Sequence, residues 1–295
     1  MLSHDFNGIL VIHKPQNMTS HDVVAILRKK LKMKKIGHTG TLDPMATGVL
    51  PVCIGRATKV VDFLTDGRKG YACKMKLGSS TDTQDQWGTT CKTGSLDHIS
   101  ETTIIDVINS FVGEIDQIPP MYSAVKVGGQ KLVDLARQGI EIKRQPRKRI
   151  IYSIESIGLD GAYVSFDVFC SKGTYIRTLC NDIGEKLGCY AHMTELKRIY
   201  SEPFEIADAS SLEHISIETI DQYLKPIDAA VSWMPKLILP DTEDMVQKIS
   251  NGVKLDLTSY SSSDAVYQRC YIGDSFYGIA MKTHNKLVMK KLIIG

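Results

Sequence analysis

The segment Gly37–Leu50 reads GHTGTLDPMATGVL and constrains the fold more than any other part of the chain. Its three glycines favour backbone angles that other residues avoid, and Pro44 pushes Asp43 towards an extended conformation. The segment therefore predicts a shaped loop that presents Asp43, rather than a plain helix or strand. A purely structural interpretation stays open here, because a carboxylate in such a loop commonly caps a nearby backbone N–H group.

Basic residues gather in two places, although the net charge of +3 is small for a chain of 295 residues. Clusters of this density favour contact with a polyanion, and each is also compatible with a solvated helix end or loop. The clusters consist of Lys29, Lys30, Lys32, Lys34 and Lys35, and of Lys143, Arg144, Arg147, Lys148 and Arg149.

The cysteines and the N-terminal residues indicate the compartment. The seven cysteines form no Cys-x-x-Cys pair and have no histidines at metal-ligand spacing, so they predict free thiols in a reducing cytosol and no structural zinc. The first residues lack a basic and then apolar secretion signal, and no apolar stretch is long enough to cross a membrane. We therefore expect a cytoplasmic protein.

Apolar periodicity and capping residues predict the elements around the loop. Tyr175 and Arg177 lie two residues apart in a segment expected to be extended, where they would share one face. Residues 117–149 are basic and interrupted by proline and glycine, which favours a functional or disordered excursion from a compact domain. Strands are predicted over 8–15, where Pro15 stops the run, over 69–78 and over 163–170. Helices are predicted from the cap at Thr19–Asp22 through Leu31, and over 56–64, 100–112 and 176–187.

Several ordered motifs resemble those of the TruB family, the bacterial tRNA pseudouridine-55 synthases. The resemblance covers roughly residues 8–205, and a series of motifs in the right order is far more specific than one short pattern. The matching motifs are the loop with Asp43, Lys14-Pro15, Lys69 with Tyr71, Thr81–Gly88 with Asp85, Pro119–Lys126 and Ser171–Arg177.

The resemblance implies an α+β fold with two domains. A pseudouridine synthase catalytic domain is expected over residues 1–234, with a central mixed, largely antiparallel sheet flanked by helices. Within it, residues 117–149 correspond to an RNA-gripping insertion, and residues 235–295 to a small β-rich PUA-like domain. The implied reaction flips uridine 55 out of the T loop of tRNA, cleaves its N1–C1′ bond and joins C5 to C1′. This reaction needs no metal and no cofactor.

The resemblance also assigns roles to residues. Asp43 is the expected catalytic carboxylate, since a carboxylate beside C1′ can attack it or stabilise positive charge there. Arg177 would keep Asp43 ionised, because an opposite charge at contact distance favours the ionised form. Tyr71 would stack on the uracil, and service as a proton acceptor would require local activation; on the residues alone, a strand tyrosine also fits ordinary packing. His38 would enter the gap that the flipped base leaves, although a histidine bonded within its own loop is the alternative.

The remaining positions and partners follow in the same way. Lys14, Pro15, Tyr175 and Leu196 correspond to substrate-binding positions, and Asp85 to an acidic residue behind the site. The expected partner is the T arm of tRNA, bound by a monomer without an obligatory protein partner or a membrane. Two alternatives stay open: a guide-RNA-dependent relative, against which the long insertion argues, and a non-catalytic RNA-binding or tRNA-folding protein.

Overall fold

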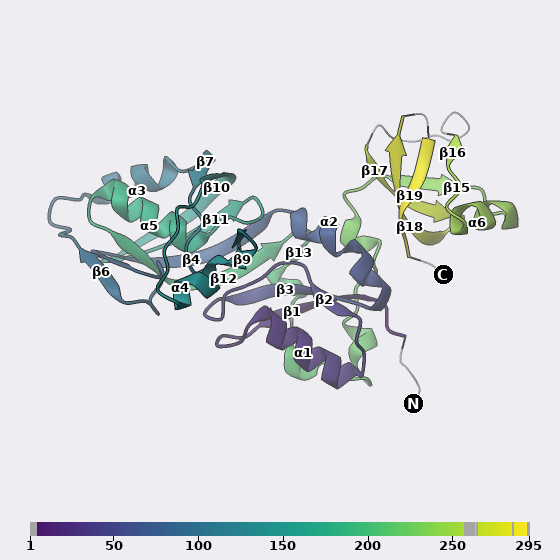
Figure 1. Ribbon diagram of the computed structural model, residues 1–295, viewed down its shortest axis with the longest axis horizontal. Helices are drawn as coiled ribbons and strands as arrows, with labels where there is room; N and C mark the ends of the chain where they lie inside the picture. The colour runs from purple at the N-terminus through teal and green to yellow at the C-terminus, as the bar shows by residue number, and fades with distance from the viewer. Residues whose placement is uncertain (1–4, 257–262, 264, 285, 294–295) are drawn as a thin grey trace.

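Two β-sheets organise the chain. The computed structural model describes residues 5–256, 263, 265–284 and 286–293. A large mixed sheet with helices extends through most of these residues, and a smaller sheet forms at the C-terminal end, coloured light green to yellow in Figure 1. The architecture confirms the predicted α+β class with a central sheet and a C-terminal β unit. None of the helices in the described ranges is long and apolar enough to cross a membrane.

The large sheet is antiparallel except at two places. Its main path runs β14-β1-β3-β12-β4-β11-β10-β7, with β2 and β13 paired at the side to β3 and β12. The β1–β14 and β3–β12 pairs are parallel. Its strands are β1 (Gly8–Lys14), β2 (Ile36–His38), β3 (Thr47–Ile54), β4 (Lys69–Leu77), β7 (Gly113–Gln117), β10 (Arg147–Asp160), β11 (Tyr163–Cys170), β12 (Ala191–Ser201), β13 (Phe204–Glu205) and β14 (Ser210–Ser211).

The smaller sheet has the order β15-β17-β18-β19-β16. Its strands are β15 (Lys236–Leu239), β16 (Leu255–Asp256), β17 (Tyr267–Ile272), β18 (Ser275–Thr283) and β19 (Lys286–Leu292). Two short hairpins stand apart from both sheets, and they are formed by β5 (Ser79–Thr81) with β6 (Thr90–Thr93) and by β8 (Lys126–Val127) with β9 (Gln130–Lys131).

Both faces of the large sheet are covered near its N-terminal strands. Successive strand residues point to opposite faces, so Leu10 and Ile12 join the core under the α-helices, while Ile9 and Val11 join a second cluster on the other face. The α-helices are α1 (Ser20–Leu31), α2 (Val61–Asp66), α3 (Glu101–Asn109), α4 (Leu132–Arg137), α5 (Ile176–Leu187) and α6 (Glu243–Ser250). Short 3₁₀ turns are η1 (Gly55–Val60), η2 (Ile206–Asp208), η3 (Leu212–His214), η4 (Ile220–Gln222) and η5 (Ala229–Val231).

Local chemistry explains where α1 begins. The Thr19 side chain accepts a hydrogen bond from the Asp22 N–H, and the Asp22 carboxylate accepts one from the Thr19 N–H, so a capping box starts the helix. Val23, Val24 and Leu27 then turn to the core at helical spacing. This helix packs against the loop that carries Asp43.

The second cluster joins the two sheets. It combines residues of β1 and β3 with Ile279 and Ile293 from the C-terminal unit. Across this seam the rings of Phe63 and Tyr267 meet edge to face with centroids 5.1 Å apart, and Lys59 donates a hydrogen bond of 2.5 Å to the Leu292 carbonyl. The C-terminal sheet is therefore anchored to the rear of the large sheet.

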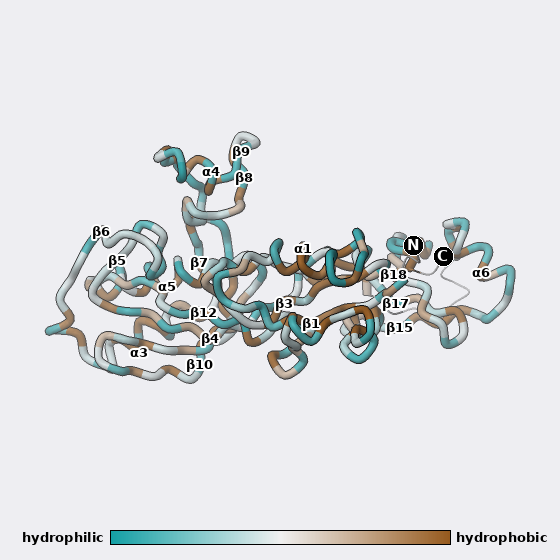
Figure 2. The backbone as a smooth tube through the Cα atoms, turned by 90° about the horizontal axis from the view of Figure 1, so that it is seen from below, coloured by the Kyte–Doolittle hydropathy of each residue, from teal (hydrophilic) through white to brown (hydrophobic). Residues whose placement is uncertain are grey.

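The expected insertion leaves the body of the molecule. Figure 2 shows β8, β9 and α4 projecting away from the large sheet, joined to it by two connecting segments. The hairpin residues are exposed, and α4 buries only Leu132 and Leu135. The excursion ends where β10 rejoins the sheet at Arg147.

Candidate active site

The Asp43 loop is held in place by bonds at several points. The Thr39 N–H donates to the Pro51 carbonyl at 3.1 Å, and the Leu42 N–H donates to the Ser20 hydroxyl at 2.8 Å. The Ala46 N–H closes a turn onto the Asp43 carbonyl at 3.0 Å. The backbone of Asp43 therefore forms the turn, and its carboxylate stays available for another partner.

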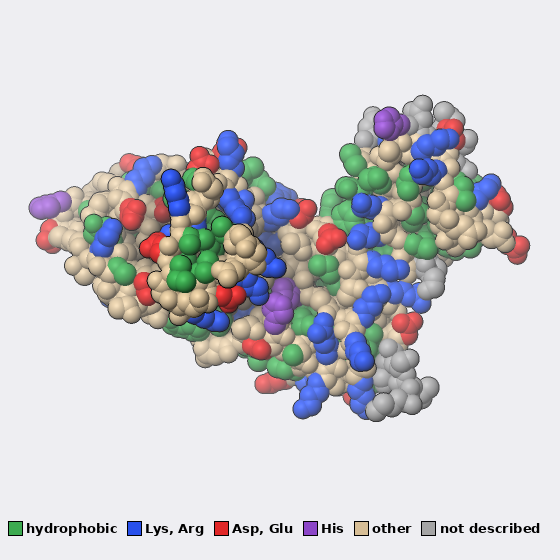
Figure 3. All heavy atoms as spheres, viewed as in Figure 1, with side chains coloured by type: hydrophobic (Ala, Val, Ile, Leu, Met, Phe, Trp, Pro, Cys, Tyr) green, Lys and Arg blue, Asp and Glu red, His purple; other side chains and the backbone are tan. Residues whose placement is uncertain are grey.

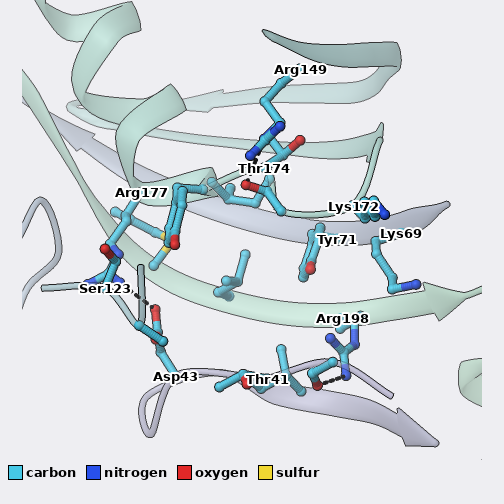
Figure 4. A pocket seen from close by; sticks show the side chains of 18 of the residues that line it. Thr41, Asp43, Lys69, Tyr71, Ser123, Arg149, Lys172, Thr174, Arg177 and Arg198 are labelled. Carbon is cyan, nitrogen blue, oxygen red and sulfur yellow. Dashed lines mark hydrogen bonds and ion pairs between the residues drawn. The ribbon is translucent and has the colours of Figure 1, made fainter. Parts of the chain in front are cut away.

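That partner is Arg177. The Asp43 Oδ2 atom lies 3.1 Å from Arg177 Nη2, and the Asp43 side chain is 40% exposed while that of Arg177 is 6% exposed. The same nitrogen donates to the Tyr122 carbonyl at 2.6 Å. Figure 4 shows Asp43 and Arg177 facing each other at one end of a cavity. A buried cation thus holds a carboxylate that solvent can still reach.

Asp85 holds Arg177 from the other side. Its carboxylate lies 3.7 Å from Arg177 Nη1 and is only 8% exposed. It also accepts hydrogen bonds from the Thr83 hydroxyl at 2.8 Å and from the Trp87 N–H at 3.0 Å. Because a buried cation needs compensating charge, the two carboxylates together account for the burial of Arg177.

The prediction that Tyr175 and Arg177 share a strand face is wrong. The strand β11 ends at Cys170, a turn with Gly173 at φ 72° follows, and Arg177 lies in the first turn of α5 with Tyr175 as its N-cap residue. The Gln117 side chain donates to the Tyr175 carbonyl at 2.9 Å and accepts from the Tyr175 N–H at 2.7 Å. These two hydrogen bonds fix the start of the helix. The Arg177 guanidinium carbon lies 5.9 Å from the Tyr175 ring centroid.

A cavity of about 550 Å³ opens beside these groups, and five of the predicted site residues line it. They are Asp43, Tyr71, Tyr175, Arg177 and Leu196. Tyr71 comes from β4 and is only 8% exposed, and burial raises the pKa of its phenol. Ser123 lies on the same wall, and its buried hydroxyl oxygen has no hydrogen-bond partner among the described residues.

Lys14 and Pro15 lie outside this wall. The Lys14 ammonium donates to the carbonyls of Met18 at 2.6 Å and Pro15 at 2.8 Å, with Pro44 at 3.4 Å. Burial lowers the pKa of Lys14 to about 8, against the opposing charge of Asp43. Lys14 therefore connects the chain after β1 with the Asp43 loop through the Pro44 carbonyl. Pro15 instead borders a second cavity of about 530 Å³ beside α1.

His38 also lies outside the cavity wall. Its ring meets that of His21 edge to face with centroids 5.0 Å apart, and its Nδ1 accepts from the Gly40 N–H at 3.3 Å. Burial, followed by the charges of His21 and Arg198, lowers the pKa of His38 to about 4. The ring is therefore neutral at physiological pH, and its Nδ1 is bonded within its own loop.

Arg198 and Ser123 also line the cavity, and no site role is predicted for either from the sequence. Arg198 is 1% exposed and follows Leu196 by two residues in β12. That spacing places the two side chains on one face of a strand, and it is the signal that could have identified Arg198. Among the described residues, no group of three His, Cys, Asp or Glu side chains is arranged to hold a metal ion.

Comparisons with known proteins agree on one family. Residues 28–176 match the model described as TruB family pseudouridylate synthase (N terminal domain), and residues 177–232 match the tRNA pseudouridylate synthase B C-terminal domain. The tRNA pseudouridine synthase B of Clostridium kluyveri is 47% identical over 98% of this chain and 100% of its own. That of Alkaliphilus oremlandii is 52% identical over 84% of this chain and 83% of its own.

Solved structures are similar over nearly the whole chain. A chain in the structure described as a Cbf5-Nop10-Gar1 complex has a TM-score of 0.75 and 29% identity, with 97% of this chain and 85% of that chain covered. A chain in an H/ACA RNP bound to a substrate RNA containing 2′-deoxyuridine has a TM-score of 0.74 and 27% identity, covering 98% of this chain and 85% of that chain.

Proposed function

Since the chain belongs to the TruB family of pseudouridylate synthases, we propose that it isomerises a tRNA uridine to pseudouridine, at position 55 in the T loop. The predicted family and enzyme class are thereby confirmed. Curated relatives at 43–52% identity carry the name tRNA pseudouridine synthase B. The position in the T loop and the roles of individual residues are the finer part of the proposal.

One observation carries the assignment of chemistry. The Asp43 carboxylate lies on the cavity wall, 3.1 Å from a buried arginine, and its side chain is 40% exposed. A carboxylate of this kind can attack C1′ or stabilise positive charge there while the uracil leaves. Arg177 fixes its orientation, and Asp85 fixes Arg177. We assign Asp43 and Arg177 to catalysis on this basis.

Tyr71 is suited to hold the detached base. It lies on the cavity wall opposite the Asp43 loop, as Figure 4 shows, so a uracil beside Asp43 meets its ring. Tyr175 and Leu196 complete the apolar lining. The uracil must stay bound while it turns, because C5 has to replace N1 at C1′. The proposed role of Tyr71 is stacking on the base, together with acceptance of the proton that leaves C5.

The cavity requires the nucleotide to leave its stack. A volume of about 550 Å³ is sufficient for a nucleotide, and flipping a base costs roughly a few kcal/mol in lost stacking. His38 is proposed to fill the vacated position in the RNA. Its neutral ring suits this role, because an uncharged imidazole is less costly to place between bases than a charged one.

Cationic surfaces support RNA binding. The insertion carries the exposed basic residues Lys126, Lys131, Arg137 and Lys143, and the exposed Arg147 and Lys148 follow at the start of β10. Figure 3 shows further lysine and arginine side chains between the large sheet and the C-terminal unit. There burial and the charges of Lys35 and Arg56 lower the pKa of Lys59. Such contacts bind phosphates and weaken with added salt, while base contacts in the cavity select the uridine.

We also propose that the protein is a monomer that acts in the cytoplasm without a protein partner or a cofactor. Residues from 235 onward are proposed to form a PUA-like C-terminal domain. A guide-dependent mode is the second candidate, since one of the similar solved chains belongs to an H/ACA RNP bound to a substrate RNA. The match over 100% of a curated tRNA enzyme at 47% identity favours the stand-alone mode.

A tritium-release assay tests the proposal. The substrate is a T-arm stem-loop RNA whose target uridine carries tritium at C5, incubated without cofactor or partner protein. We expect wild type to release the tritium label. Asp43→Asn should bind the RNA but release no tritium. If wild type binds the RNA tightly and in a salt-sensitive way but releases no tritium, the chain is an RNA-binding protein without this activity on the T arm. Release by Asp43→Asn at the wild-type rate would remove Asp43 from the mechanism.

A further inference from the structure

The Arg198 guanidinium donates hydrogen bonds to both ends of the Asp43 loop. Its Nε donates to the Val49 carbonyl at 2.6 Å, and its Nη2 donates to the Gly40 carbonyl at 3.2 Å. Gly40 and Val49 flank the segment that carries Asp43. Figure 4 shows the guanidinium beneath the cavity, between this loop and Tyr71. One side chain therefore contacts both ends of the loop.

The strand order fixes Arg198 in this place. β12 lies between β3 and β4, so that Arg198 is paired with Gly48 on one side and Tyr71 on the other. Gly48 has φ 100°, and a Cβ atom there would lie 2.2 Å from the Arg198 carbonyl oxygen. The two backbones can approach this closely only because residue 48 is glycine.

Arg198 also acts on Tyr71. Burial raises the pKa of the Tyr71 phenol, whereas the charge of Arg198, its partner on the neighbouring strand, lowers it. The other groups that influence Tyr71 are Cys170 from β11 and Asp43 from the loop, and both raise its pKa. Of the charged groups that act on Tyr71, Arg198 is the positively charged one.

The surroundings of Arg198 make its burial costly. Among the ion pairs of the described residues, none includes Arg198, and burial lowers its pKa against the influence of Tyr71. Lys14, Lys69 and His38 also lie near enough for the Arg198 charge to lower their pKa values. A buried charge without a carboxylate partner contributes little to folding stability, so its presence at the cavity favours a functional role.

We propose that Arg198 is a positioning residue for the isomerisation. It holds the Asp43 loop in a fixed position relative to Tyr71, and it keeps a positive charge near the Tyr71 hydroxyl. This inference rests on the proposed roles of Asp43 and Tyr71. After C5 has bonded to C1′, the proton that leaves C5 passes to the Tyr71 phenolate. N1, left with the electron pair of the broken bond, takes one proton from solvent, and Tyr71 returns its proton to solvent. The cation favours the phenolate that this step consumes.

Two variants separate the two actions of Arg198. Arg198→Met removes the charge, and Arg198→Lys keeps the charge but cannot bond both loop ends. Lys197→Met is the matched control, because it removes one charge from an exposed side chain next to Arg198 in the same strand. Tritium release from the T-arm RNA is measured across about pH 6 to 10 to give kcat and KM separately, because the pH dependence of kcat reports the base in the complex.

We expect Arg198→Met to lower kcat roughly 100-fold near neutral pH, the size of loss seen when a preorganised charge is removed. KM should stay within about threefold of wild type, and the rise of kcat should move to higher pH, because the Tyr71 phenolate then forms less readily. Arg198→Lys should keep the wild-type pH dependence at a rate lowered roughly tenfold by the looser loop. Lys197→Met should match wild type.

A wild-type rate and pH profile for Arg198→Met would overturn the proposal, as would a loss of kcat that only follows the loss of folded protein seen by circular dichroism. Should Arg198→Met fail to fold, Arg198→Lys decides: full wild-type kcat refutes the loop contact. Asp43→Asn is assayed alongside. If Asp43→Asn is inactive while Arg198 variants behave as wild type, only the role of Arg198 fails; if Asp43→Asn is active, the proposed function itself fails.

Discussion

Neutralising the two carboxylates that contact Arg177 should have opposite consequences. Asp43→Asn should abolish activity at little cost in stability, whereas Asp85→Asn should lower the stability of the fold. The reason is their difference in burial: the Asp43 side chain is 40% exposed and that of Asp85 is 8% exposed. The same arginine is therefore paired with one screened carboxylate and one unscreened carboxylate.

The distances give the magnitudes. At an effective dielectric constant of about 20, the separations of 3.1 Å to Asp43 and 3.7 Å to Asp85 correspond to about 5 and about 4.5 kcal/mol of Coulomb attraction. Solvent screening reduces an exposed pair to about 0–1 kcal/mol. Breaking a buried pair costs about 3–5 kcal/mol when the remaining charge loses its only partner. Because Arg177 keeps Asp43 and the Tyr122 carbonyl, we expect about half, roughly 2 kcal/mol, for Asp85→Asn.

Thermal unfolding followed by circular dichroism tests this difference. For domains of this size about 2–4 °C corresponds to 1 kcal/mol, so Asp85→Asn should lower Tm by roughly 4–8 °C and Asp43→Asn by less than about 4 °C. Asp106→Asn, at an exposed position of α3, controls for loss of one negative charge. A larger drop in Tm for Asp43→Asn than for Asp85→Asn would contradict this dependence on burial, as would an Asp85→Asn variant that unfolds like the control.

Three further predictions follow from the site and its surroundings. Because burial holds the pKa of His38 at about 4 rather than 6.5, the unfolded chain takes up its proton first on acidification; stability should fall between these pH values, and His38→Asn should flatten that part of the pH curve in unfolding experiments. Gly48→Ala should cost more than about 3 kcal/mol, since the new Cβ would lie 2.2 Å from the Arg198 carbonyl oxygen, whereas Gly161→Ala, with φ 57° and no neighbour within 4 Å, should cost about 1 kcal/mol in urea unfolding. Arg147→Ala, on the exposed start of β10, should reduce the slope of log K against log salt by about 1 in RNA binding while kcat stays unchanged; an unchanged slope would place the RNA elsewhere.

Local patterns predicted much of the fold. The capping box at Thr19 and Asp22 and the Ser100 cap of α3 satisfy backbone groups within one turn, so short sequence windows contain the information. The glycines and proline around Asp43 predicted a loop for the same reason. The mixed, largely antiparallel sheet came instead from the family resemblance, because neither parallel pair has a local signature.

The candidate site was less accessible from sequence because it depends on register between distant strands. Arg198 faces Tyr71 and Gly48 only because β12 lies between β4 and β3. The helix predicted over 176–187 agrees with α5, but the shared extended face predicted for Tyr175 and Arg177 does not hold, because the Gln117 side chain, far away in sequence, bonds the Tyr175 backbone where the helix begins. The roles predicted for the eight site residues, and for Asp85 behind them, stay predictions.

The place of β12 in the large sheet has a consequence for synthesis on the ribosome. While the chain grows, β4 can pair with β11, but its other edge has no partner until Ala191–Ser201 emerges. An open strand edge invites pairing with other chains. The nascent protein therefore passes through a stage that depends on rapid completion or chaperone cover. A fragment that stops short of Ser201 should be an aggregating intermediate rather than a smaller enzyme.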